Sequence, residues 1–162
     1  TINPSLVMGP SLTTQTQSTS IDVVLDLGNG RQRTGVPMLE FGIVDVREVA
    51  TAHILAGLNS SAEGRFVLSA YTASLLQMAI ILRTRFPQYP LPTRQLPKFL
   101  VKLVAPIAAG VSRKFVQKNV GYALRFDNSR SKDVLDVQYR PLTETLCDHF
   151  GQMIDDGLLK RR

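Results

Sequence analysis

The chain has 162 residues, 44% of them hydrophobic, which is the composition of a folded globular protein and excludes a disordered one. Nineteen Lys and Arg against thirteen Asp and Glu give a net charge of +6. The cations are scattered, without interleaved aromatic residues, which favours a solvated basic face over a nucleic-acid surface. No apolar run reaches the about 18 residues of a membrane span, although the basic stretch 98–118 leaves a contact with anionic lipid open.

The single cysteine, Cys147, excludes an intramolecular disulfide. Cysteine usage of this kind fits a reducing compartment, so we expect a cytoplasmic protein. Cys147 lies in an amphipathic helical pattern with no base beside it, which predicts an inert, packed thiol rather than a nucleophile.

The first ten residues read as a buried strand that leads into a turn at Asn3 and Pro4. An isolated strand is unstable in water, so this one needs neighbours, and we expect the chain to be the later part of a longer protein. A polar loop at 11–20 follows. Ser20 is then the expected N-cap of a helix that ends at Gly28 or Gly30.

Two further strands are predicted, at 41–45 and 65–69, because both are short apolar runs. Asp45 and Glu48 have the spacing of a capping box, and the helix that they begin is expected to close at Gly57. A helix at 72–85 comes next. Its buried side is expected to consist of Leu75, Leu76, Ala79, Ile80 and Leu82.

The second half of the chain is mainly helical. Three prolines keep 86–92 extended, and a helical stretch at 97–116 is expected to be interrupted near Pro106. A short helical turn at 132–135 and a last helix at 142–157 complete the pattern. Strands that alternate with helices predict an α/β fold with a mainly parallel sheet, followed by a mostly helical lobe.

No motif that carries chemistry is complete in this sequence. Gly28 and Gly30 lack the third glycine of the dinucleotide fingerprint and stand at a helix end. His53 and His149 lie on separate helices without a Cys or paired carboxylate at ligand spacing, so no metal site is expected. No lysine follows any of the four tyrosines at the fourth position. The chain therefore offers no catalytic constellation of its own, and no catalytic residue is assigned.

Several segments, in the same order as in the family, resemble the back half of an extended short-chain dehydrogenase/reductase, in the branch around dihydroflavonol and cinnamoyl-CoA reductases. The segments are 2–10 (Ile-Asn-Pro-Ser-Leu-Val-Met-Gly-Pro), 44–50 (Val-Asp-Val-Arg-Glu-Val-Ala) with Ala52 and His53, 64–69 (Gly-Arg-Phe-Val-Leu-Ser), 86–93 (Phe-Pro-Gln-Tyr-Pro-Leu-Pro-Thr), 127–131 (Asp-Asn-Ser-Arg-Ser) and 139–146 (Tyr-Arg-Pro-Leu-Thr-Glu-Thr-Leu). Together they span nearly the whole chain.

The resemblance implies the C-terminal portion of a Rossmann-like sheet that binds NADP or NAD, with a helical substrate-binding lobe. Residues 1–162 would form one partial domain, in which 1–70 supply the last strands and helices of the sheet and 71–162 mainly the lobe. In the family, the glycine-rich turn and the Tyr-x-x-x-Lys pair precede the Asn-Pro strand, and both are missing from this chain.

The resemblance also implies the cofactor-binding residues. Pro4, Ser5, Leu6 and Val7 match the turn that lies against the nicotinamide in the family. The carboxyl end of a strand faces the ligand crevice of an open α/β sheet, although Pro4 could instead simply end a strand. Ser20 aligns with a family serine near the cofactor phosphates, and a plain N-cap role is equally open.

The resemblance implies that the parent protein is an NAD(P)H-dependent carbonyl reductase acting on a small molecule, and that this chain alone is inactive. A sugar-nucleotide epimerase or sterol dehydrogenase of the same superfamily stays open. So does a non-catalytic module that senses nucleotides or docks a partner. Substrate identity and oligomeric state are not fixed by the sequence.

Overall fold

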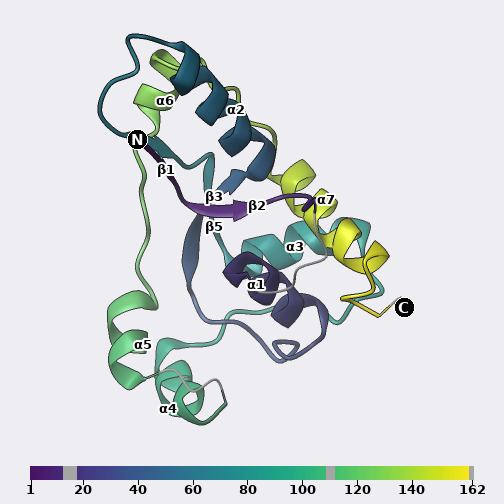
Figure 1. Cartoon of the computed structure of the whole chain (residues 1–162). Helices are drawn as coiled ribbons and strands as arrows, with labels where there is room; N and C mark the ends of the chain where they lie inside the picture. Colours follow the sequence, from purple (N-terminus) through teal and green to yellow (C-terminus); the bar gives the residue numbers. More distant parts are fainter. Residues whose placement is uncertain (13–17, 109–111, 161–162) are drawn as a thin grey trace.

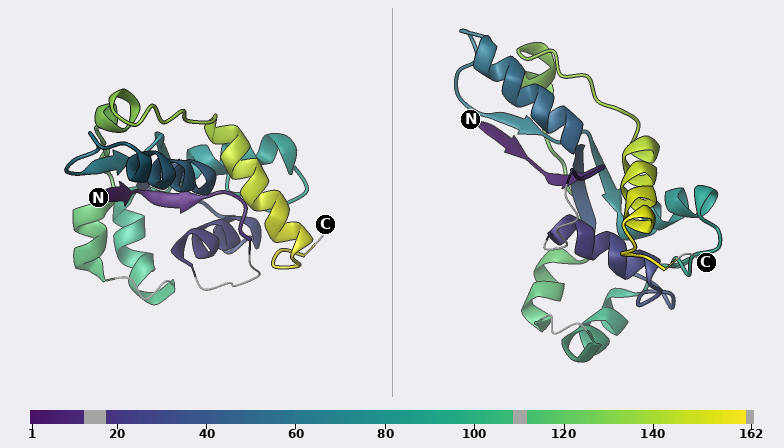
Figure 2. Two further views of the ribbon diagram at one scale, coloured as in Figure 1. Left: turned by 45° about the horizontal axis from the view of Figure 1, so that its top comes forward. Right: turned by 45° about the vertical axis from the view of Figure 1, so that its right-hand side comes forward.

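The computed structural model describes residues 1–12, 18–108 and 112–160. Two small sheets cross the centre of the molecule, and helices cover them on both sides (Figures 1 and 2). The strands are β1 (Ile2–Pro4), β2 (Leu6–Met8), β3 (Glu40–Asp45), β4 (Phe66–Leu68) and β5 (Tyr71–Ser74). The helices are α1 (Thr19–Gly28), α2 (Val46–Leu58), α3 (Leu75–Arg85), α4 (Lys98–Ala108), α5 (Arg113–Asn119), α6 (Ser129–Asp133) and α7 (Leu142–Asp155).

The first segment of the chain belongs to two sheets. β1 runs parallel to β4, with Pro4 opposite Leu68. After Ser5 the chain enters β2, which is parallel to β3, and β3 pairs with β5 in the antiparallel direction. The predicted α/β class is therefore confirmed. The pairings are mainly parallel, and the antiparallel addition of β5 makes the three-stranded sheet mixed.

Two hydrophobic cores lie on either side of these strands. The larger core holds Leu27, Met78 and Phe150, all fully buried, together with parts of α1, α3 and α7. The second core lies under α2 and α6 and includes Phe66 and Leu68 of β4. Each core is built from segments far apart in the sequence, so the chain folds as interlocked layers rather than as successive units.

The capping chemistry predicted at Asp45 is present in full. The Asp45 side chain accepts a hydrogen bond from the backbone at the start of α2, and the Glu48 side chain accepts one from the Asp45 amide. α2 ends at Leu58, one residue beyond the predicted Gly57. The last helix, predicted at 142–157, is α7, which also ends close to its predicted position.

The helix predicted at 72–85 was wrong in its first turn. Residues 71–74 form β5, because Ala73 pairs with Phe41 across the sheet and the helix starts only after Ser74. Ser74 and Gln77 form a second capping box, which was not among the predicted helix starts. Leu75, Ala79 and Leu82 are buried as expected, but Ile80 is 52% exposed, because it lies on the opposite, solvent-facing side of α3.

The interruption predicted near Pro106 is confirmed, since α4 ends at Ala108 and a separate helix, α5, starts at Arg113. Helix α4 continues through Pro106 to Ala108. A proline in the last turn removes a single backbone hydrogen bond, so the helix tolerates it there. Part of the predicted loop at 11–20 (residues 13–17) and part of the helical stretch at 97–116 (residues 109–111) lie outside the described residues.

Aromatic packing ties α7 to the loop after α3. Phe150 is fully buried, with its ring centroid 4.8 Å from that of Phe86 and 5.0 Å from that of Tyr89. Edge-on and tilted rings at these distances add to the burial of apolar area. The non-helical segment that follows Phe86 is thus anchored by the last helix of the chain.

Substitution of Phe150 by Ala is expected to lower the free energy of unfolding by about 3–5 kcal/mol, because it leaves a cavity between α7 and α3. Urea unfolding of the purified chain measures this loss. The matched control is Ile80→Ala, whose exposed side chain should cost less than about 1 kcal/mol. Equal losses for the two variants would contradict the packing described here.

Candidate cofactor-binding edge

The predicted nicotinamide turn lies where β1 and β4 end side by side. Pro4 stands opposite Leu68, and the Ser5 amide donates a hydrogen bond of 2.9 Å to the Leu68 carbonyl oxygen. Because the two strands are parallel, their carboxyl ends meet at the same edge, which is where ligands bind in open α/β sheets. The structure therefore places Pro4 and Ser5 at the carboxyl ends of two parallel strands, and their contact with a nicotinamide stays a prediction.

Two serine hydroxyls at this edge are buried without a hydrogen-bond partner in the described part of the chain: those of Ser5 and Ser69. Buried polar atoms are normally paired, so such atoms point to a group that the structure does not contain. Ser69 immediately follows β4, next to the strand end where Ser5 lies. The residues present thus fit a polar ligand at this edge.

Leu6 and Val7, unlike Pro4 and Ser5, have their side chains packed in the hydrophobic cores. Both belong to β2, and their side chains pack against opposite cores, Leu6 against the larger core and Val7 against the second. The Ser5 amide is already used by Leu68. At this edge the Pro4 ring is exposed and the buried Ser5 hydroxyl has no partner, while Leu6 and Val7 hold the segment in place through their packing.

The N-cap predicted at Ser20 was wrong. Ser18 is the N-cap of α1, with extended backbone (φ −150°), and Ser20 is already inside the helix. Ser18, Thr19 and Ser20 all have N-cap chemistry, so the pattern alone could not choose among them. Ser20 is buried, and its hydroxyl lies 2.9 Å from that of Ser18. Helix α1, whose first turn contains Ser20, packs against β2, the strand that contains Leu6 and Val7.

Gly9 fixes the direction in which the chain leaves β2. Its φ of +114° is a conformation that side chains rarely adopt, and a Cβ there would lie 3.1 Å from an Asp45 carboxylate oxygen. The Gly9 amide donates a 3.0 Å hydrogen bond to Nδ1 of His149. Burial lowers the pKa of His149, which keeps this ring neutral and able to accept.

Asp45 is the centre of a buried polar cluster. Its carboxylate accepts hydrogen bonds from the Arg47 amide (2.8 Å), from the Arg47 guanidinium (2.9 and 2.7 Å) and from the Thr145 hydroxyl (2.8 Å). Burial alone would raise the pKa of Asp45, but the hydrogen bonds from Arg47 and Thr145 outweigh it, so this pKa lies below its usual value. Asp45 is thus held as a carboxylate, and Asp148 also pairs with Arg47 at 3.0 Å.

Glu48 connects the same cluster to the start of α7. Its carboxylate accepts hydrogen bonds from the backbone amides of Asp45 (3.2 Å) and Arg140 (2.5 Å). Burial raises the pKa of Glu48, and its two amide hydrogen bonds do not fully offset this effect. The sequence predicts Asp45 and Glu48 as a helix cap but gives no sign of Thr145, His149 and Arg140. No local signal marks these partners, which come from about a hundred residues further along.

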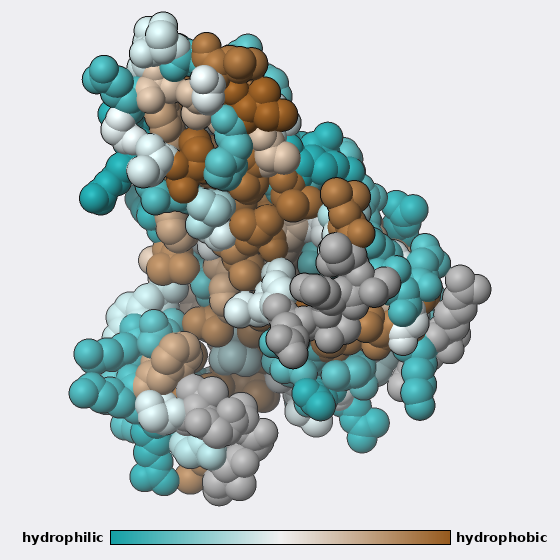
Figure 3. Space-filling model, in the orientation of Figure 1, coloured by the Kyte–Doolittle hydropathy of each residue, from teal (hydrophilic) through white to brown (hydrophobic). Residues whose placement is uncertain are grey.

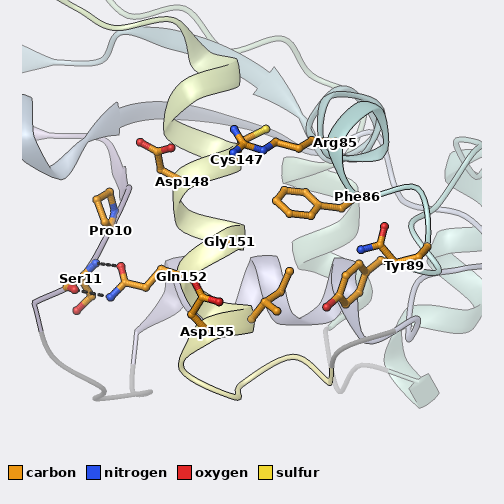
Figure 4. A pocket seen from close by; sticks show the side chains of 12 residues that line it. Pro10, Ser11, Arg85, Phe86, Tyr89, Cys147, Asp148, Gly151, Gln152 and Asp155 are labelled. Carbon is orange, nitrogen blue, oxygen red and sulfur yellow. Dashed lines mark hydrogen bonds between the residues drawn. The ribbon is translucent and has the colours of Figure 1, made fainter.

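A surface groove of about 790 Å³ lies elsewhere, between α7, the end of α3 and the segment after β2 (Figure 4). Its lining residues are Pro10, Ser11, Arg85, Phe86, Gln88, Tyr89, Cys147, Asp148, Gly151, Gln152, Ile154 and Asp155. None of the five predicted cofactor residues lines it. Gln152 closes one end through two hydrogen bonds to the Ser11 backbone. Cys147 is buried, which raises its pKa and fits the expected packed thiol.

Residues 1–12, 18–108 and 112–160 contain neither a cluster of metal-ligating side chains nor a membrane-spanning helix. No group of three potential metal ligands occurs within these ranges. His53 is exposed on α2 and hydrogen-bonds to the Val49 carbonyl, whereas His149 is buried on α7. None of the described helices is long and apolar enough to cross a membrane.

Known proteins resemble this chain over between about half and nearly all of its length. No family model matches it. Tetraketide alpha-pyrone reductase 1 of Arabidopsis thaliana is 34% identical over 160 residues, which are 98% of the chain and 42% of that reductase. Cinnamoyl-CoA reductase CAD2 of Medicago truncatula is 43% identical over 94 residues, 58% of the chain and 28% of that protein. The chain thus spans less than half the length of the curated relatives it matches.

Solved structures agree with these relatives. Yeast methylglyoxal/isovaleraldehyde reductase Gre2, solved with NADPH, has a TM-score of 0.69 at 25% identity, covering 95% of the chain and 42% of Gre2. Vestitone reductase from alfalfa has a TM-score of 0.68 at 18% identity, covering 98% of this chain and 44% of the reductase. At this identity the likeness concerns the fold alone. The fold and the sequence together confirm the resemblance. The chain is similar to part of the extended short-chain dehydrogenases/reductases of the dihydroflavonol and cinnamoyl-CoA reductase branch.

Replacing Asp45 with Asn is expected to lower the free energy of unfolding at neutral pH by about 1–3 kcal/mol, since Arg47 and Thr145 lose a charged partner. The pKa of Asp45 is lower in the folded protein, so its contribution is fully present above the unfolded value of about 3.9. It disappears as the pH falls through the folded value. The difference between wild type and D45N should therefore shrink in acid.

Urea unfolding between about pH 7 and about pH 3 measures this change, and Asp133→Asn, at an exposed position, serves as the control. Asp133→Asn should have little effect at any pH. A wild-type advantage over D45N that stays constant into acid would show that the Asp45 charge does not stabilise the fold.

Proposed function

We propose that this chain forms the C-terminal part of an NADPH-dependent reductase of small carbonyl compounds. The observation that carries the proposal is the meeting of Pro4, Ser5 and Leu68 at the carboxyl ends of two parallel strands, with an unpaired serine hydroxyl. The names of the relatives support it, since all those given above are reductases. NADPH is favoured over NAD because two of the similar reductase structures contain NADPH.

The cofactor, when bound, would supply the hydride that reduces the substrate carbonyl. In this chain, Pro4 and Ser5 would form the floor under the nicotinamide, and the Ser5 hydroxyl would form a hydrogen bond with the nicotinamide. Ser20 would lie towards the phosphates, near the first turn of α1, whose free amides and helix dipole favour an anion. Leu6 and Val7 would position the floor through their packing.

The remaining parts of the site would come from a preceding half of the protein. Among the described strands, β1 and β4 pair only with each other, and a two-stranded sheet is marginally stable in water. On α2, Ile54 is 62% and Leu58 83% exposed, and Figure 3 shows hydrophobic surface over this end of the molecule. We propose that further parallel strands, a glycine-rich turn and a Tyr-x-x-x-Lys pair complete this surface. Residues 71–162 would then form mainly the substrate lobe.

The test uses the product of the full coding sequence that contains this chain. A Tyr-x-x-x-Lys pair is expected within about 30 residues before Thr1, and the purified protein should oxidise NADPH when given aromatic or aliphatic aldehydes and ketones. Conversion of nucleotide sugars without net NADPH consumption would identify an epimerase instead. A folded protein that binds NADPH but reduces no carbonyl would indicate a sensing module. We expect the enzyme in the cytoplasm, which fractionation checks.

Substitution of Ser5 by Phe in that full-length protein should raise the KM for NADPH by about tenfold or more, because the ring fills the floor and removes the hydroxyl. Steady-state kinetics with varied NADPH measure the effect. Ser60→Phe, at an exposed turn just after the end of α2, is the matched control and should leave KM unchanged. An unchanged KM for S5F in a folded protein would exclude this edge as the cofactor site.

A further inference from the structure

Helices α4 and α5 form a small lobe that stands apart from the two main cores (Figures 1 and 2). The two helices pack on each other through Val101, Val116 and Val120, a third core of few residues. This α4–α5 lobe consists of residues 98–108 and 112–119. Its inner contacts use only one side of α4, so the rest of that helix faces outward.

The outward side of α4 is apolar. Phe99 is 70% exposed, Leu103 60% and Val104 50%, and Leu100 is exposed beside them. Phe99 and Leu103 are four residues apart and so lie next to each other on the helix surface, as do Leu100 and Val104. An amphipathic helix normally turns its apolar stripe towards the core. Here that stripe faces solvent, which marks an interaction surface.

Charge on the lobe has a single sign. The sequence from 64 to 126 contains ten Lys and Arg and no Asp or Glu, whereas the rest of the chain contains nine basic and thirteen acidic residues. On the lobe itself, Lys102, Arg113, Lys114 and Lys118 are exposed, and no carboxylate in the described ranges forms an ion pair with them. Lys98 lies over the Tyr122 ring, 4.4 Å from its centroid.

Lysines and the apolar stripe are arranged side by side. Lys98 and Lys102 are four residues apart and flank the edge of the stripe that holds Phe99, while α5 adds its cations from the neighbouring helix. A helix with bulky apolar residues on one face and Lys or Arg beside them is the type that lies in a membrane interface. Figure 3 shows hydrophilic and hydrophobic residues next to each other on this lobe.

We propose that the α4–α5 lobe binds an anionic lipid surface, with Phe99 and Leu103 inserted among the acyl chains and the lobe cations at the headgroups. Charge complementarity selects this occupant: a second copy would bring another uncompensated cluster of cations against the first. Nucleic acid would leave the apolar stripe uncovered, because phosphates contact the cations alone. The proposal does not depend on the reductase activity.

Vesicle flotation of the purified 162-residue chain tests the proposal, since lipid-bound protein rises in a density gradient and aggregated protein does not. The chain should float with vesicles of phosphatidylcholine plus phosphatidylglycerol and much less with phosphatidylcholine alone. Flotation should weaken as salt is raised, because screening reduces the attraction of the cations to the headgroups.

Two double variants separate the contributions. Phe99→Ser with Leu103→Ser should weaken binding to the anionic vesicles by about tenfold or more, and Lys114→Gln with Lys118→Gln should also weaken it severalfold. The matched control is Ile54→Ser with Leu58→Ser on α2, which removes equally exposed apolar side chains and should bind as wild type does. Because all these side chains are exposed, the variants should fold, and circular dichroism verifies that they do.

Four outcomes would overturn the proposal. If the chain floated equally well with neutral and anionic vesicles, the lobe cations would have no role in binding. If the α2 control variant lost as much binding as the Phe99 and Leu103 variant, the apolar stripe of α4 would not be the binding surface. Oligomers that dissociate in the Phe99 and Leu103 variant, without any flotation, would assign the stripe to a second copy. Tight binding of a short RNA duplex without flotation would assign the cations to nucleic acid.

Discussion

The buried carboxylate of Asp45 is the interaction on which the rest of the structure depends. It ends β3, starts α2, and reaches across to Thr145 on α7. Its closeness to Gly9, together with the φ of +114° at that residue, favours glycine at the exit of β2. A charged group without water is costly unless every lone pair is used, so the surrounding donors are held in fixed positions. One carboxylate thereby joins the first strands to the last helix.

Because Asp45 holds the first strands and the last helix together, the segment around Ser5 can pair with a strand in each of the two sheets. The chain leaves one sheet at Ser5 and enters another at Leu6, and both halves are held by parallel neighbours. The hydrogen bond from Gly9 to His149 fixes the far end. The short piece between the sheets is held by its neighbours on both sides, and the Ser5 hydroxyl is left without a partner there.

Two surfaces of the chain differ in what would cover them. The open strands β1 and β4 and the exposed side of α2 present backbone and apolar groups, which another part of a sheet covers well. The α4–α5 lobe combines apolar side chains with uncompensated positive charge. The first surface suits the completion of a fold, and the second suits a partner that carries negative charge.

Local chemistry was enough to predict much of the fold. The capping box at Asp45, the strands at 41–45 and 65–69, the non-helical segment after Phe86 and the last helix each follow from residues within a few positions. Helix caps, prolines and apolar periodicity act over only one or two helical turns. The elements that they specify can therefore be predicted from neighbouring residues in the sequence. The likeness to the reductase branch is equally explicit, because it consists of short motifs in a fixed order along the chain.

Other features were decided by tertiary contacts. β5 replaced the first turn of a predicted helix because β3 offered an edge for Ala73 to pair with. Ser18, not Ser20, became the N-cap, although both residues have the same local chemistry. The partners of Asp45 and Gly9, and the unpaired hydroxyl of Ser5, depend on which distant segments meet. The sequence by itself determined the local elements and the family likeness, because both depend on neighbouring residues. Only the folded chain decided which polar atoms are satisfied and which face solvent, because that depends on groups about a hundred residues away.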